Sequence, residues 1–112
     1  MKYALLAYGS ASEARDDQPI DAGIAAVLAR PEVVGWLRLR SVESATTVRS
    51  VAPRTVLSDG PFIDSKEFLG GVIIIETDNL DGALAIADDF QELRSIGGIE
   101  VRPILDQELG GA

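Results

Sequence analysis

The stretch from Asp59 to Gly71 holds the residues of this sequence that are best placed for chemistry. Asp59 precedes Gly60 and Pro61, which favour a tight turn, so its carboxylate would be held in a fixed direction. A carboxylate in such a place can act as a general acid or base if burial raises its pKa. It can equally accept backbone N–H groups within its own turn, and the residues alone favour this structural role.

Further side chains around this turn could complete a binding site. Phe62 is expected to anchor the loop by burying its ring. Lys66 and Glu67 could place an ammonium and a carboxylate at a pocket mouth, or they could be neighbours on an exposed loop. We therefore take Asp59 as the candidate catalytic residue, and the candidate ligand-binding residues are Arg49, Gly60, Pro61, Phe62, Lys66 and Glu67.

Other polar and aromatic residues lie in predicted strands. An arginine in a strand must reach solvent or find an acid, so we expect Arg49 or Arg102 to bond to Asp59 or Glu67. Three aromatic residues could line a pocket for an aromatic substrate, although core or interface positions are commoner for such residues. They are Tyr3, Tyr8 and Trp36.

Several kinds of chemistry are not expected from this composition. The sequence has no Cys and no His, which removes thiolate sites, disulfides and the commonest general base. Gly70 and Gly71 precede a predicted strand instead of a helix, so they do not form a phosphate-binding loop. A metal would need an all-oxygen site from Asp59, Asp64 and Glu67, whose spacing matches no known loop pattern. We predict no metal and no cofactor.

Length and charge limit the partners. A chain of 112 residues with 46% apolar content predicts one domain over residues 1–112. The net charge of −8 would repel nucleic acid and anionic membranes. The sequence contains no apolar run long enough for a bilayer and does not begin like a secretory signal, so we expect a cytoplasmic protein.

The first half of the chain predicts a strand, a helix and another strand. Residues 2–8 are apolar and too short for a helix, which indicates a strand inside a sheet. Pro19 suits a first helical turn, and the helix should end at about Arg30, before Pro31. Its apolar face would be Ile20, Ile24, Val27 and Leu28. Residues 35–40 alternate as a strand, with Leu37 and Leu39 on one side and Trp36, Arg38 and Arg40 on a wetter side.

The second half predicts three more strands, a helix and a fourth strand. The β-branched runs 46–51 and 55–58 indicate a hairpin, and residues 72–75 a strand whose two faces must both be covered. Asp78 or Asn79 should cap a helix, with Asp78 and Asp81 spaced like a capping box. The apolar stripe of this helix would be Leu80, Ala83, Leu84, Ala87 and Phe90. Residues 99–104 form a final strand, and 106–112 a tail that could fray.

These elements predict an α+β fold of ferredoxin-like βαββαβ type with an added β-hairpin. The sheet would be antiparallel, with two helices on one face. Two helices cannot cover both faces of such a sheet. Pairing the uncovered face with that of a second copy would solve this problem, so we expect a homodimer.

The motif Asp59-Gly60-Pro61-Phe62, together with the opening from Met1 to Leu6 and the ending Val101-Arg102-Pro103, resembles the DGPF family within the YCII-related domains. In that family a Thr-Lys-Glu commonly follows the motif, and this chain has Ser65-Lys66-Glu67. The resemblance covers nearly the whole chain. It implies a dimeric α+β barrel in which two sheets face one another.

The resemblance does not name a reaction. Some YCII-related proteins are thought to use a His-Asp dyad, which a chain without His cannot reproduce. The first hypothesis is therefore a cytoplasmic homodimer that binds or transforms a small molecule at the Asp59 loop. The alternative is a non-catalytic regulatory or interaction protein, since genes for DGPF proteins often lie beside those of sigma factors. Whether the protein is an enzyme stays open at this point.

Overall fold

The computed structural model describes residues 1–10 and 16–109, which form two antiparallel sheets, two α-helices and a short 3-10 helix. Residues 11–15 of the predicted polar loop and residues 110–112 of the predicted tail lie outside the described residues. In chain order the elements are β1 (Lys2–Gly9), α1 (Ala22–Leu28), β2 (Val33–Arg38), η1 (Val42–Ser44), β3 (Thr46–Val51), β4 (Arg54–Asp59), β5 (Phe68–Glu76), α2 (Leu80–Glu92) and β6 (Gly98–Pro103). The prediction of a small α+β protein is confirmed, and the arrangement is consistent with a ferredoxin-like fold.

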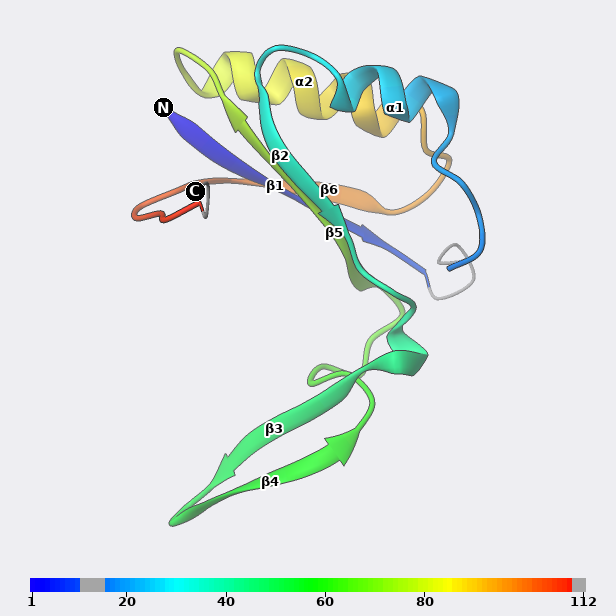
Figure 1. Ribbon diagram of the computed structural model, residues 1–112, viewed down its shortest axis with the longest axis vertical. Coiled ribbons are helices and arrows are strands. Elements are labelled where there is room, and N and C mark those ends of the chain that lie inside the picture. Colours follow the sequence, from blue (N-terminus) through cyan, green and yellow to red (C-terminus); the bar gives the residue numbers. More distant parts are fainter. Residues whose placement is uncertain (11–15, 110–112) are drawn as a thin grey trace.

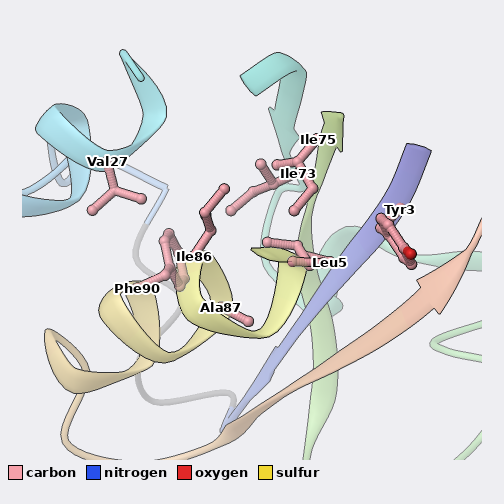
Figure 2. Packing of buried hydrophobic residues seen from close by; sticks show 9 residues of the cluster. Tyr3, Leu5, Val27, Ile73, Ile75, Ile86, Ala87 and Phe90 are labelled. Atoms are coloured by element: carbon pink, nitrogen blue, oxygen red, sulfur yellow. The ribbon is translucent and has the colours of Figure 1, made fainter. Parts of the chain in front are cut away.

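Four strands form the main sheet in the order β2-β5-β1-β6. β1 and β5 lie at its centre because they carry the longest apolar runs. Leu5 on β1 and Ile73 and Ile75 on β5 point toward the helices and pack with Ile86 and Phe90 of α2 (Figure 2). The side chains of Leu5 and Ile75 are completely buried.

Both helices begin at side-chain caps. The Asp21 carboxylate accepts the N–H groups of Gly23 and Ile24, so α1 begins after Asp21 and the prediction that Pro19 lies in its first turn is wrong. Asn79 caps α2 by accepting the N–H of Gly82 at 3.0 Å, so Asn79, and not the predicted box of acidic residues, fixes this end.

The buried face of α2 differs in part from the predicted stripe. Ala83, Ala87 and Phe90 are buried as expected, and Ile86 joins them. Leu80 and Leu84 are exposed instead, because the helix is rotated so that Ile86 faces the sheet. Within the described part of the chain, neither helix is long and apolar enough to span a membrane.

Both helices lie on the same face of the main sheet (Figure 1). We call the opposite side the bare face. In the middle of this face Leu6 and Val72 stand opposite each other on β1 and β5, and Leu37 stands beside Val72 on β2. Leu6 and Val72 are half-buried within one chain, and Leu37 is exposed. The prediction that β5 needs cover on both faces is therefore met on the helix side only.

The predicted hairpin is confirmed as β3 and β4, which pair only with each other in the described structure. We call these two strands the arm. Figure 1 shows the arm projecting from the end of the main sheet, on the side away from the helices. Thr47 is its one buried residue among those described.

Strand β2 has the predicted length but lies two residues earlier than predicted, and it has no wetter side. It ends at Arg38, and Leu39 and Arg40 follow it. Trp36 is 47% exposed and Leu37 is 50% exposed, although they point to opposite faces. Because β2 is an edge strand at the end of the sheet, neither of its faces is fully covered.

Candidate functional site

The predicted turn after Asp59 forms and joins the arm to the rest of the chain. Gly60 has a φ of +96°, a conformation that favours glycine. Its N–H donates to the carbonyl of Ala45 at 2.8 Å, and the hydroxyl of Thr47 donates to its carbonyl at 2.6 Å. The structure places Asp59 at the exposed end of β4, opposite Thr46.

Phe62 and Arg49 lie together, but not in the way the sequence predicts. The guanidinium carbon of Arg49 is 5.4 Å from the centre of the Phe62 ring. Phe62 is 68% exposed, so the prediction that burial of its ring anchors the loop is wrong. The loop is fixed instead by the hydrogen bonds of Gly60.

The predicted arginine–carboxylate bonds are also absent from the described residues. Arg49 makes no ion pair there with Asp59 or Glu67, because its guanidinium lies over the Phe62 ring. Arg102 is exposed and lies 4.0 Å from Glu100 on its own strand, an arrangement of little energetic weight.

Lys66 and Glu67 are exposed neighbours on the loop before β5. The N–H of Glu67 donates to the hydroxyl of Ser65 at 3.1 Å, which makes a local turn. Glu67 and Pro61 line a wide hollow of about 730 Å³ between this loop and Tyr8, Leu39 and Phe68. Of the seven residues predicted as a site, Pro61 and Glu67 line this hollow, while Asp59, Arg49 and Lys66 do not.

A second hollow lies on the helix side of the sheet, beneath α1, and the sequence did not predict it. Its volume is about 330 Å³, which is within the range of small-molecule sites. We call it the α1 cavity. Ile24 and Leu28 of α1 and Phe90 of α2 form its upper wall, and Ile73 lies in its floor.

Strand pairing explains why there is room for this cavity. Arg38, Gly71 and Ala7 stand side by side on β2, β5 and β1, facing the helices. The next row, toward the core, is Trp36, Ile73 and Leu5. Gly71 has no side chain and Ala7 has only a methyl group, so the first row leaves space beneath the helix. The large side chains of the second row leave no such space.

Charged side chains surround the opening of the α1 cavity, and most are already engaged. Asp21 caps α1. Asp16 accepts the N–H of Ser41 at 2.7 Å and lies 3.8 Å from Arg40. Arg38 differs because it has no acidic partner among the described residues. Its guanidinium donates a hydrogen bond of 2.9 Å to the carbonyl of Gln18.

Arg94 fixes the inner end of the α1 cavity. Its guanidinium donates to the carbonyl of Tyr8 at 2.6 Å and to that of Gly98 at 3.3 Å, and it lies over the ring of Phe90. These contacts tie the end of α2 to β1, so we assign Arg94 to the framework of the cavity.

One group of carboxylates in the described residues is close enough to share a cation. It consists of Asp88, Asp89 and Glu92 on the exposed side of α2. Asp89 already pairs with Arg30 at 2.8 Å. The group is therefore part of the acidic surface. Asp59, Asp64 and Glu67, the set considered from the sequence, do not form such a group in the described part of the chain.

Part of the signal for the α1 cavity was visible in the sequence. Trp36 was expected as a pocket or core residue, and it does line the cavity. Its alternation with Arg38 placed both residues on one face of a strand. The small residues that make the room, Gly71 and Ala7, lie far apart in the chain, and only the strand register brings them together.

Comparison with known proteins identifies relatives across nearly the whole chain. The family of YCII-related domains matches residues 1–108. Uncharacterized protein R00369 of Rhizobium meliloti (strain 1021) is 35% identical over 114 residues, which cover 93% of this chain and 92% of that protein.

Proposed function

We propose that this chain, which belongs to the family of YCII-related domains, is a homodimer that binds a small organic molecule in the α1 cavity. The observation that carries the proposal is the cavity itself: about 330 Å³, with an apolar wall and floor and charged residues at its opening. Small-molecule sites in proteins commonly combine an apolar lining with a few polar groups in this way.

Binding suits these residues better than proton transfer does. The two carboxylates nearest the opening, Asp16 and Asp21, already accept backbone N–H groups and hold the surrounding loop and helix. The chain has no histidine that could replace them. We therefore propose ligand binding as the function and assign no reaction.

A substitution that fills the cavity tests the binding site. Ala7→Leu adds a branched side chain to the row where Gly71 leaves space, and it should abolish the binding of fragments found by ligand-observed NMR with the wild-type protein. Ala26→Leu is the matched control, because Ala26 is exposed on α1 and does not line the cavity. Fragments that bind both variants equally well would show that the cavity is not the site.

The dimer is proposed from the bare face. The row formed by Leu6, Val72 and Leu37 is apolar and incompletely covered, and a second copy would cover it by two-fold pairing. The substitution Val72→Lys should convert the dimer to a monomer in light scattering after gel filtration. A wild-type protein that is monomeric at micromolar concentration would contradict the proposal.

The arm favours a second candidate function, that of an interaction protein. Val48 and Leu57 stand opposite each other on the arm and are 63% and 74% exposed. A surface of this kind suits a protein contact. Asp59→Asn tests whether the ligand site is the α1 cavity or the Asp59 loop: it should leave fragment binding in the α1 cavity intact, since Asp59 does not line that cavity. Loss of fragment binding in this variant would show that fragments bind at the Asp59 loop and not in the α1 cavity.

A further inference from the structure

We propose that the ligand of the α1 cavity is a small, planar molecule with one carboxylate, which Arg38 binds while Trp36 contacts the ring. This inference rests on the proposed function, because it assigns a chemical class to the ligand of the same cavity. Three features of the cavity lead to it: the charge of Arg38, the position of Trp36 and the shape of the floor.

The charge of Arg38 has no acidic partner among the described residues. Its one described bond is the donation from Nη1 to the carbonyl of Gln18. A guanidinium carries five N–H donors, so several remain for a ligand, and their fork matches the two oxygens of a carboxylate. Arg40, at the same opening, differs because Asp16 lies 3.8 Å away. Among the described residues at the opening, Arg38 is therefore the arginine without an acidic neighbour, and we assign anion binding to it.

Trp36 lies on the same face of β2 as Arg38, two residues before it. Two residues along a strand correspond to about 6.6 Å, roughly the distance between a carboxylate and the far edge of an attached ring. Trp36 is 47% exposed although it faces the helices, so about half of its surface remains accessible to a ligand. A ligand ring can cover that surface by stacking or edge contact.

The floor of the cavity favours a flat ligand. Beside Arg38 it consists of Gly71 and Ala7, which rise little above the backbone, and it continues to Ile73 beside Trp36. A single negative charge is expected because the chain as a whole carries a net charge of −8. A second negative charge on the ligand would meet the carboxylates of Asp16 and Asp21, and the other described arginine at the opening, Arg40, already lies beside Asp16.

Three ligands of similar size test this class. 4-Methylbenzoate is the planar acid, 4-methylbenzamide has the same shape without the charge, and 4-methylcyclohexanecarboxylate has the charge without the planar ring. Binding can be followed by calorimetry and by fluorescence, since Trp36 is the one tryptophan of the sequence. We expect the planar acid to bind at least tenfold more tightly than either of the other two and to change the Trp36 emission.

Arginine substitutions give the matched control. Arg38→Gln should abolish the preference for acid over amide, because an amide side chain offers neither the charge nor the fork. Arg54→Gln removes an exposed arginine on the arm and should leave the preference unchanged. Retention of the preference in Arg38→Gln would overturn the role of Arg38.

The remaining outcomes separate this inference from the proposed function. If acid and amide bind equally well and Ala7→Leu abolishes both, the assignment of a carboxylate is wrong while the cavity remains the site. If acid and cyclohexane acid bind equally well, the assignment of a planar ligand is wrong. If none of the three binds, the ligand class is overturned, and the fragment comparison between Ala7→Leu and Ala26→Leu alone decides whether the cavity binds at all.

Discussion

The sheet-and-helix body and the arm contain similar apolar residues but bury them to very different degrees. In the body, Leu5 and Ile75 are completely inaccessible to solvent. In the arm, Leu57 is 74% exposed and Val48 is 63% exposed. Both regions are antiparallel strands, so strand formation alone does not determine burial.

The difference follows from what packs on each sheet. The strands of the body have α1 and α2 on one face, whereas the arm is a two-stranded sheet with no described helix packed on it, and Arg49 of the arm contacts Phe62 of the following loop (Figure 1). An isolated hairpin is at best marginally stable in water. The arm therefore depends on its joint with the body, at Thr47 and Gly60, and on any partner that covers it.

The largest effect should come from matching leucine truncations in the two regions. Leu5→Ala should lower the free energy of unfolding by about 3 to 4 kcal/mol, because it leaves a cavity in the core. Leu57→Ala should cost less than about 0.5 kcal/mol, as expected for an exposed side chain. Urea unfolding monitored by circular dichroism measures both. Similar losses would show that Leu57 is buried in solution and that the arm is covered by a partner.

Glycine substitutions in one turn of each region should give the next largest difference. Gly97 and Gly60 both have positive φ, but a Cβ on Gly97 would clash with the carbonyl oxygen of Tyr8, while one on Gly60 would meet open space. Gly60→Ala should cost about 1 kcal/mol from backbone strain alone. Gly97→Ala should cost roughly 2 to 3 kcal/mol, because the β1 backbone must also move.

Thermal unfolding of the two alanine variants side by side measures this difference. The wild-type protein and Gly98→Ala, at a neighbouring glycine where a Cβ would meet nothing within 4 Å, serve as references. Equal losses for Gly60→Ala and Gly97→Ala would mean that the contact between the Gly97 turn and β1 does not limit the fold.

The same contrast explains what the sequence could and could not predict. The body was predictable as far as its elements are concerned, because the run Val72 to Ile75 and the cap at Asn79 are local patterns. The exposure of Phe62 and the rotation of α2 that buries Ile86 could not be predicted from the sequence. Both depend on how elements distant in the chain pack against one another. The α1 cavity required the alignment of Ala7, Gly71 and Arg38 across three strands, which is a property of register.

The joint between arm and body should show a smaller, local effect. Thr47→Val keeps the shape of the side chain but removes the hydroxyl that donates to the Gly60 carbonyl at 2.6 Å, at a cost of about 1 kcal/mol. Because this bond holds the base of the arm, hydrogen exchange of β3 and β4 amides should accelerate while that of β1 and β5 stays unchanged. Thr47→Ser retains the hydroxyl and is the control. Equal acceleration in all four strands would mean that the arm and the body open as one unit.

The smallest expected effect compares the arginine–aromatic contact of the arm with that of the body. Arg49 lies over Phe62 at 5.4 Å and Arg94 over Phe90 at 5.9 Å, but Phe62 is exposed and Phe90 is buried. A double-mutant cycle with Arg49→Gln and Phe62→Leu should give a coupling of about 0.5 kcal/mol, as for a solvated cation–π pair. The coupling between Arg94 and Phe90 should be larger, since Arg94 is also fixed by its bonds to Tyr8 and Gly98. A stronger coupling at Phe62 would show that its ring is shielded from water in solution. The aromatic ring at the arm would then be buried, as Phe90 is in the body.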